Sequence, residues 1–246
     1  MQQKSKVVLV AIILLSIFLV IYLSYSLFMK PEQTEYQSRT ILGTISLPQA
    51  EISGNMSVDE TIQNRRSVRS FSATSLTLND VSQLLWAAQG ITDSERNFRA
   101  TPSAGHVYPM EVYLVTGDGS VQGLEAGIYH YNPFNHTLEK IVEGDQRYNL
   151  SQAAHQQQWV NDAPISLVIT GNYQKMIDKY PNETLSMRFV HMEAGHIGEN
   201  IYLEAVSRGL GTVAIGSFYD DQMINILKLP SNETPLYIYP VGYQSS

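Results

Sequence analysis

Asn64–Phe71, which reads Asn-Arg-Arg-Ser-Val-Arg-Ser-Phe, is the most informative stretch of this 246-residue chain. It places Arg65, Arg66 and Arg69 beside Ser67 in a chain whose formal net charge is −7. Guanidinium groups bind phosphate oxygens in a bidentate manner, and hydroxyl groups add neutral hydrogen-bond donors. The run is therefore a candidate anion site, and a solvated basic surface is the alternative interpretation.

The N-terminal region predicts a membrane anchor. Residues 7–29 carry no charge and are dominated by Val, Leu and Ile. As a helix they would be about 35 Å long, enough to cross the hydrocarbon core of a bilayer. A cleaved signal peptide is the alternative, although its apolar part is usually about 7–15 residues long. Because Lys4 and Lys6 precede the run, the positive-inside rule places the rest of the chain on the extracytoplasmic side of the cell membrane.

The rest of the chain divides into a tether and one domain. Residues 1–30 are the predicted anchor, residues 31–57 a polar tether with one short extended piece at 40–47, and residues 58–246 a single domain with a substantial core. The chain has no cysteine, so neither disulfides nor thiol chemistry is expected. Its acidic balance argues against a nucleic-acid partner.

Hydrophobic periodicity predicts mixed helices and strands in this domain. Thr77 and Asp80 resemble a capping box that opens a helix, and Gly90 ends that helix. Further helical patterns occur at 59–64, 150–160, 186–207 and 220–227, and strand patterns at 111–116, 127–131, 137–142, 165–170, 212–215 and 236–241. The order of these elements predicts an α+β domain, a sheet flanked by helices.

Four motifs in order carry a family resemblance. They are Asn64–Phe71, Thr-Pro-Ser-Ala-Gly-His-Val-Tyr-Pro-Met-Glu-Val-Tyr at 101–113, Met-Glu-Ala-Gly-His-Ile-Gly-Glu-Asn-Ile-Tyr-Leu at 192–203, and Gly-Leu-Gly-Thr-Val-Ala-Ile-Gly-Ser-Phe at 209–218. In this order the chain resembles the FMN-dependent nitroreductase-like flavoenzymes, and within them the SagB-type dehydrogenases, the azoline-oxidase branch. The resemblance covers nearly the whole domain and implies a nitroreductase-like fold with a central, mostly antiparallel sheet.

The resemblance also implies a homodimer with two FMN molecules at the subunit interface. In that pattern Arg65, Arg66 and Ser67 hold the FMN phosphate and ribityl end, and Arg69 approaches the pyrimidine side of the ring. A cation there would favour the reduced flavin, which carries negative charge near N1. A surface ion pair is the alternative for Arg69.

Two small-residue segments would complete the cofactor site. By the family pattern Pro102, Ser103 and Ala104 form a second wall that the partner subunit contributes, and a plain tight turn is the alternative. Gly216 and Ser217 would bring backbone N–H groups near flavin N5, the atom that accepts hydride. For them the alternative is an ordinary turn after a strand.

Lys179 and Tyr180 are the predicted catalytic pair. In azoline oxidases a Lys-Tyr pair at a similar place is thought to act in deprotonation, and oxidation of an azoline to an azole removes a ring proton. A desolvated lysine could act as the base and a tyrosine as donor or relay. A helix end before Pro181, with a lysine at the negative end of the helix dipole, is the competing interpretation.

His191, Glu193 and His196 invite a metal interpretation, which the spacing disfavours. The two histidines are five residues apart and diverge by about 140° around a helix, whereas zincin histidines are four apart on one face. No metal is therefore predicted, and this segment is assigned to a close-packed dimer helix.

The leading hypothesis is an FMN-dependent oxidoreductase that transfers hydride at flavin N5. Its substrate would be an azoline in a modified peptide, or a small electrophile such as a nitroaromatic or quinone with NAD(P)H as donor. A non-enzymatic, membrane-tethered flavin-binding module is the alternative, motivated by the location and by Gln244, where the family often has a basic residue. A surface protein without a cofactor is the third hypothesis.

Overall fold

The computed structural model describes Leu19 and residues 39–245. The predicted anchor, apart from Leu19, and the first part of the predicted tether lie outside the described residues. Within the described ranges, no helix combines the length and apolar character needed to cross a membrane. The chain divides into two units, residues 1–36 and 37–246, and the second unit carries the fold described below.

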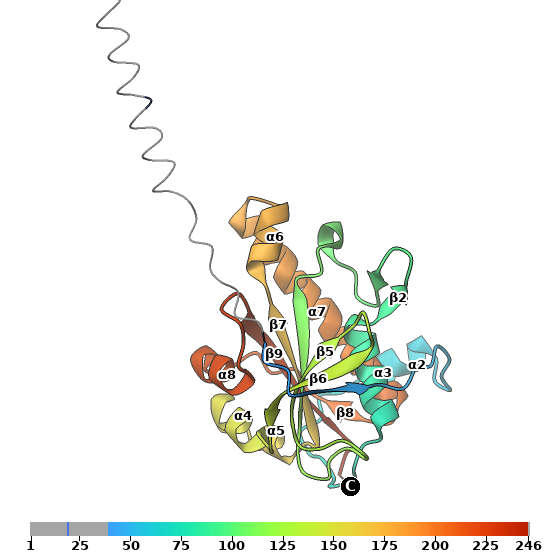
Figure 1. Ribbon diagram of the computed structural model, residues 1–246. Coiled ribbons are helices and arrows are strands. Elements are labelled where there is room, and N and C mark those ends of the chain that lie inside the picture. Colours follow the sequence, from blue (N-terminus) through green and yellow to red (C-terminus); the bar gives the residue numbers. More distant parts are fainter. Residues whose placement is uncertain (1–18, 20–38, 246) are drawn as a thin grey trace, which may run out of the picture. The chain divides into compact units, whose positions relative to one another are not determined.

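A seven-stranded sheet forms the centre of this unit (Figure 1). All its neighbouring strands pair antiparallel. Across the sheet the strands are β1 (Gly43–Ser46), β6 (Thr137–Glu143), β5 (Gly127–Asn132), β4 (Met110–Thr116), β7 (Ile165–Gly171), β9 (Thr234–Gly242) and β8 (Gly211–Thr212). A separate small hairpin joins β2 (Ile91–Asp93) to β3 (Phe98–Arg99). The predicted α+β architecture with an antiparallel sheet is confirmed.

The sheet is covered on both faces, and its inner strands β4 and β7 are buried at nearly every position. Successive side chains of a strand point to opposite faces. In β4, Leu114 belongs to one buried cluster and Val115 to the other, and in β7 the same division separates Leu167 from Val168. Strand β7 is buried at all seven positions.

The helices divide accordingly. Around α7 (Glu183–Ser207) lie α2 (Val58–Asn64), α3 (Leu78–Gln89) and α6 (Tyr173–Lys179), and the other cluster is covered by α4 (Arg147–Ala153), α5 (Gln158–Asp162) and α8 (Asp220–Leu227) (Figure 1). The predicted capping box of α3 is present, since the Thr77 hydroxyl accepts the Asp80 N–H and the Asp80 carboxylate accepts the Thr77 N–H. Gly90 follows the last residue of α3 as predicted.

In three places the elements differ from the sequence pattern by three residues or more. The single helix expected at 150–160 is two helices, because His155 and Gln156 adopt left-handed φ values of 55° and 61° between α4 and α5. Helix α7 begins at Glu183 rather than 186, where the Asn182 side chain accepts the Leu185 N–H. The strand expected at 212–215 ends at Thr212.

The segment assigned to the tether takes part in the folded unit from Arg39 onward. Strand β1 pairs with β6, and Leu47 is buried in the larger core cluster. The Glu51 N–H donates to Gln83 Oε1 over 2.9 Å. Residues 39–51 therefore add one edge of the sheet and a cover for α3.

Candidate functional site

The arginine-rich run lies along the edge of the sheet formed by β8 and the end of β9. The Val68 N–H donates to the Thr212 carbonyl over 2.9 Å, and the Ser72 N–H donates to the Tyr243 carbonyl over 2.8 Å. An isolated bridge pairs Ser67 with Thr212 in parallel. These backbone bonds fix residues 67–72, although they are more than 130 residues from their partners in sequence.

Tyr202 of α7 joins the run to the segment that follows β8. Its hydroxyl lies 3.2 Å from Ser67 Oγ and accepts the Ala214 N–H over 2.8 Å. The Arg65 guanidinium carbon lies 5.1 Å from the centre of the Tyr202 ring. The structure thus brings Arg65 and Ser67 into the same region as the chain leading to Gly216.

Gly216 and Ser217 are exposed after this segment. A Cβ built on Gly216 would come no closer than 3.6 Å to any other atom, which is ordinary van der Waals contact. Packing inside the chain therefore does not require a glycine here. The exposed backbone leaves room for close approach by another molecule.

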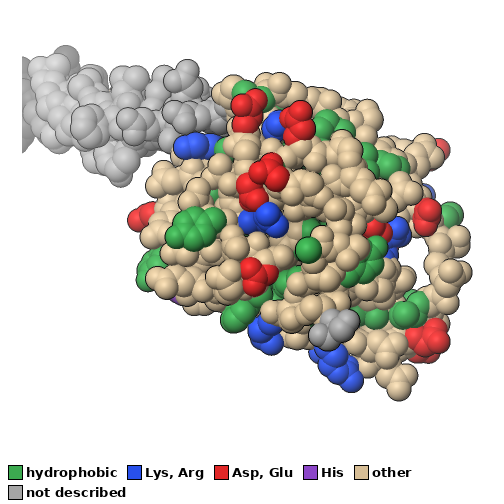
Figure 2. All heavy atoms as spheres, turned by 90° about the horizontal axis from the view of Figure 1, so that it is seen from below, with side chains coloured by type: hydrophobic (Ala, Val, Ile, Leu, Met, Phe, Trp, Pro, Cys, Tyr) green, Lys and Arg blue, Asp and Glu red, His purple; other side chains and the backbone are tan. Residues whose placement is uncertain are grey.

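The three arginines of the run carry no carboxylate partner within residues 39–245. Arg66 Nη1 donates to the backbone carbonyls of Gln63 and Arg65 over 2.9 and 2.7 Å. The Arg69 guanidinium lies 5.8 Å from the Trp159 ring. Figure 2 views the molecule from the side of β8 and shows separate Lys and Arg side chains on the surface. Uncompensated guanidinium groups beside a serine suit a phosphate group, so the donor set fits the cofactor that the resemblance implies.

The remaining predicted residues form a second group. Gly105 has a φ of +61°, and a Cβ built there would lie 2.6 Å from Tyr180 Oη and 3.4 Å from Lys179 Cε. The turn formed by Pro102, Ser103, Ala104 and Gly105 therefore contacts both predicted catalytic residues. It includes a short 3-10 helix, η1 (Ala104–His106).

Lys179 is the last residue of α6, and Tyr180 caps it, as the helix-end interpretation requires. Lys179 is exposed, while the Tyr180 ring packs 5.2 Å from the Phe189 ring. Ser186 Oγ donates to the Tyr180 carbonyl over 2.6 Å. These contacts fix Tyr180, and with it the end of α6, against the first turns of α7.

The arginine run and the group formed by residues 102–105, Lys179 and Tyr180 lie toward opposite ends of α7. Tyr202, which holds the arginine run, is 13 residues from Phe189, which packs on Tyr180; this is about 20 Å at about 1.5 Å per residue. In Figure 1 the end of α6 and the strand β8 accordingly lie far apart. A single copy of the chain does not place both groups around one small molecule.

The metal interpretation finds no support in the geometry. His191 and His196 are exposed, while Glu193 is buried. His191 Nε2 lies 2.7 Å from Tyr173 Oη. No group of three or more His, Asp or Glu residues suited to a metal ion occurs in the part of the chain that the structure describes.

Sequence reasoning missed the buried carboxyl group of Glu193. This side chain faces Ser103, Gln89 and Arg99, and burial raises its pKa to about 7. A signal was available, because Glu193 lies three residues after Val190 and four before Ile197, on the apolar stripe of α7.

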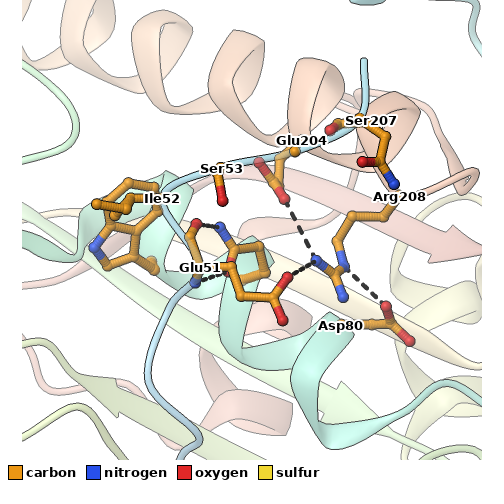
Figure 3. A pocket seen from close by; sticks show the side chains of 11 residues that line it. Glu51, Ile52, Ser53, Asp80, Glu204, Ser207 and Arg208 are labelled. Carbon is orange, nitrogen blue, oxygen red and sulfur yellow. Dashed lines mark hydrogen bonds and ion pairs between the residues drawn. The ribbon is translucent and has the colours of Figure 1, made fainter.

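The pocket of Figure 3, of about 580 Å³, is a different place. It lies between residues 51–55, α3 and the end of α7, and none of the predicted cofactor residues lines it. Arg208 points between three carboxylates, at 2.8 Å from Asp80, 3.9 Å from Glu51 and 4.0 Å from Glu204. Its charge is already compensated, so this pocket is not an anion site.

The nitroreductase family model matches residues 62–243, and the chain belongs to this family. A Methanocaldococcus jannaschii protein assigned as a nitroreductase is 41% identical over 198 residues, which are 80% of this chain and 95% of that protein. A crystal structure of a Ralstonia eutropha protein, also assigned as a nitroreductase, superimposes with a TM-score of 0.72 at 32% identity, covering 85% of this chain and 94% of that one.

The chain is also similar to a microcin-processing protein. The microcin B17-processing protein McbC of Escherichia coli is 26% identical over 157 residues. The match covers 63% of this chain and 57% of McbC. The chain thus has the fold of the nitroreductase family and is similar to a microcin-processing protein.

Proposed function

We propose that this protein is an FMN-dependent oxidoreductase of the nitroreductase family. The observation that carries the proposal is the arginine run. Backbone bonds of Val68 and Ser72 hold the run along β8 and the end of β9. The three guanidinium groups of the run have no carboxylate partner in residues 39–245. An acidic protein that keeps such a cluster uncompensated has a site suited to a dianionic phosphate.

Each residue of the run has a role in binding. Arg65, Arg66 and Ser67 would hold the phosphate, and Arg69 would lie toward the pyrimidine side of the ring and favour negative charge there. The backbone N–H groups of Gly216 and Ser217 would lie near N5. When bound, FMN supplies a ring that accepts and returns two electrons as hydride at N5, while the protein provides position and electrostatics.

A homodimer would complete the site. Because the two residue groups are about 20 Å apart along α7, Pro102, Ser103 and Ala104 would reach the flavin from the partner subunit. The outward face of α7 suits an interface, since Met187 and Met192 are exposed and Gly195 has open space at its Cβ position. A partner that covers this face would also desolvate the end of α6.

Two substrate classes are considered, and the first of them uses Lys179 and Tyr180. Lys179, desolvated at the interface, would remove a proton from an azoline ring of a modified peptide, with Tyr180 as donor or relay. The similarity to McbC supports this class. A small nitroaromatic or quinone reduced at the expense of NAD(P)H is the second class. The predicted anchor at residues 7–29 would place this activity at the cell membrane.

Separate titrations with FMN and riboflavin test the role of the arginines. Arg65→Ala and Arg66→Ala should each weaken FMN binding at least tenfold and leave riboflavin binding within about twofold, because only FMN carries the phosphate. Arg96→Ala is the matched control, since Arg96 is an exposed arginine beside the β2–β3 hairpin. A protein that stays colourless with excess FMN would refute the proposal.

A flavin-binding module without turnover is the second candidate. An isolated bridge pairs Phe71 with Gln244, so a neutral side chain follows β9 beside the arginine run. Bound FMN that no NAD(P)H or azoline donor reduces would favour this module. Rapid bleaching of the flavin absorbance by NADH would exclude it.

A further inference from the structure

Glu193 is a buried carboxyl group without a hydrogen-bond partner. Its side chain lies in the middle of α7 and is 2% exposed. Neither carboxylate oxygen has a partner of normal hydrogen-bond geometry within the described chain, although Ser103 and Gln89 turn polar side chains toward it. A buried acceptor left unpaired is costly and unusual in a native fold.

Donors without partners lie beside this acceptor. Gln89 Nε2 and Arg99 Nε are buried and have no partner in residues 39–245, while Arg99 Nη1 donates to Gln89 Oε1 over 2.8 Å. Arg99 is the charged group that faces Glu193. The cluster can therefore hold the carboxyl group neutral, or ionised next to a guanidinium, without a change of fold.

Ser103 connects this cluster to the surface. It is partly exposed, whereas Glu193 is buried, and it belongs to the turn that contacts Lys179 and Tyr180. Ser103 Oγ accepts the Tyr108 N–H over 2.9 Å. A hydroxyl group has two acceptor positions and one donor, so Ser103 retains one of each.

We propose that Glu193 holds a proton inside the protein and passes it through Ser103 to a molecule bound against the 102–104 turn. That the proton reaches a bound molecule rests on the proposed function, in which this turn lies beside the flavin. The acceptor is an oxygen anion, formed when an electrophile such as a quinone takes up hydride.

The transfer balances without a further reactant. The Glu193 O–H bond breaks and its proton joins Ser103 Oγ, while the proton originally on Ser103 forms a new O–H bond on the bound anion. No electrons change hands in the relay, and the carboxylate that remains faces Arg99 until solvent returns a proton by the reverse path. Burial raises the pKa of Glu193 to about 7 and outweighs the opposing effects of Ser103, Arg99 and Gln89. Both protonation states are therefore populated near neutral pH.

The protonation of Glu193 inside the folded protein can be tested without flavin. The unfolding free energy of the full chain is measured from pH 5 to 9 for the wild type, Glu193→Gln and Glu95→Gln, an exposed control. A carboxyl group with a raised pKa makes the fold less stable as pH rises from about 4.5 to about 7. This loss of stability with rising pH should be absent only in Glu193→Gln. If the unfolding free energy of that variant depended on pH as in the wild type, Glu193 would not hold the proton.

The relay is tested in the flavin-loaded protein. Reoxidation by a quinone should slow at least fivefold in the wild type as pH rises from 6 to 8. Glu193→Gln and Ser103→Ala should both be slow and independent of pH, while Ser103→Ala keeps the pH-dependent stability. Flavin-bearing Glu193→Gln with a wild-type pH profile would overturn the relay alone, whereas a chain that binds no FMN would refute the proposed function.

Discussion

Ser67 Oγ and Tyr202 Oη lie 3.2 Å apart, and this contact ties the arginine run to α7. The same tyrosine oxygen accepts the Ala214 N–H over 2.8 Å. One side chain on the central helix therefore sets the distance between the predicted phosphate end of the site and the segment leading to Gly216. The Tyr202 ring is held in turn by an edge-on contact with Tyr239 at 5.9 Å.

Tyr202→Phe should loosen this link while preserving the packing of the ring. Loss of the hydroxyl leaves the Ala214 N–H without its partner, which should cost about 1–2 kcal/mol of unfolding free energy. FMN binding should weaken about tenfold, because the serine and the turn are no longer fixed to each other. Denaturant unfolding and flavin fluorescence titration measure the two effects. Tyr148→Phe is the control, since Tyr148 is 64% exposed and its hydroxyl bonds nothing in the described chain; equal behaviour of the two variants would contradict the link.

Gly105 and Tyr180 should be energetically coupled. An alanine at position 105 must adopt a φ of +61° and place its Cβ 2.6 Å from Tyr180 Oη. We expect Gly105→Ala to cost about 2 kcal/mol, from backbone strain together with the clash. In a Tyr180→Phe background the clash is relieved, so the cost should fall by about 1 kcal/mol. A double-mutant cycle of unfolding free energies measures this coupling, and strict additivity would show that the two residues do not touch.

The Glu111 carboxylate should contribute to the unfolding free energy at neutral pH, and this contribution should be lost in acid. Burial alone would raise its pKa, but hydrogen bonds and attraction from His130 and Lys175 outweigh it and lower the pKa to about 2. A lowered carboxyl pKa stabilises the fold above the unfolded-state value near 4.5, and this contribution is lost as pH falls toward 2. Glu111→Gln should therefore cost about 3 kcal/mol at pH 7 and flatten the acid limb of the stability curve. Circular dichroism at pH 2–7 is the measurement, with exposed Glu143→Gln as control; parallel curves for wild type and Glu111→Gln would refute the role.

Features set by local chemistry were predictable from the sequence, and features set by distant partners were not. The capping box of α3 and the bounds of α8 follow from neighbouring residues, and both match the structure. The antiparallel sheet was implied by the family resemblance that the four motifs carry. The burial of Glu193 fits the apolar stripe of α7, but the groups that face its carboxyl group, Ser103 among them, come from segments about 90 residues or more away, and the pairing of β1 depends on β6. No periodicity records such contacts.

Arg39, the first residue of the folded unit that the structure describes, also has partners that the sequence pattern could not predict. Its guanidinium pairs with Glu233, a carboxylate that is 6% exposed and also accepts from Tyr113 Oη over 2.6 Å and from Thr170 Oγ1 over 2.8 Å. Arg39 Nε donates to the same tyrosine hydroxyl over 2.9 Å. A residue within a polar, aperiodic stretch thus compensates a buried charge between two central strands and the start of β9.

Arg39→Met should therefore destabilise the folded unit far more than a surface substitution would. Removing the guanidinium leaves the buried Glu233 carboxylate without its cation, and breaking such a pair costs about 3 kcal/mol or more. Arg39→Met combined with Glu233→Gln should recover most of the loss, because no buried charge then remains. Thermal and denaturant unfolding of the three variants, with Arg96→Ala as the exposed control, decides the matter. If Arg39→Met behaved like Arg96→Ala, residue 39 would belong to a tether, and the folded unit would begin closer to β1.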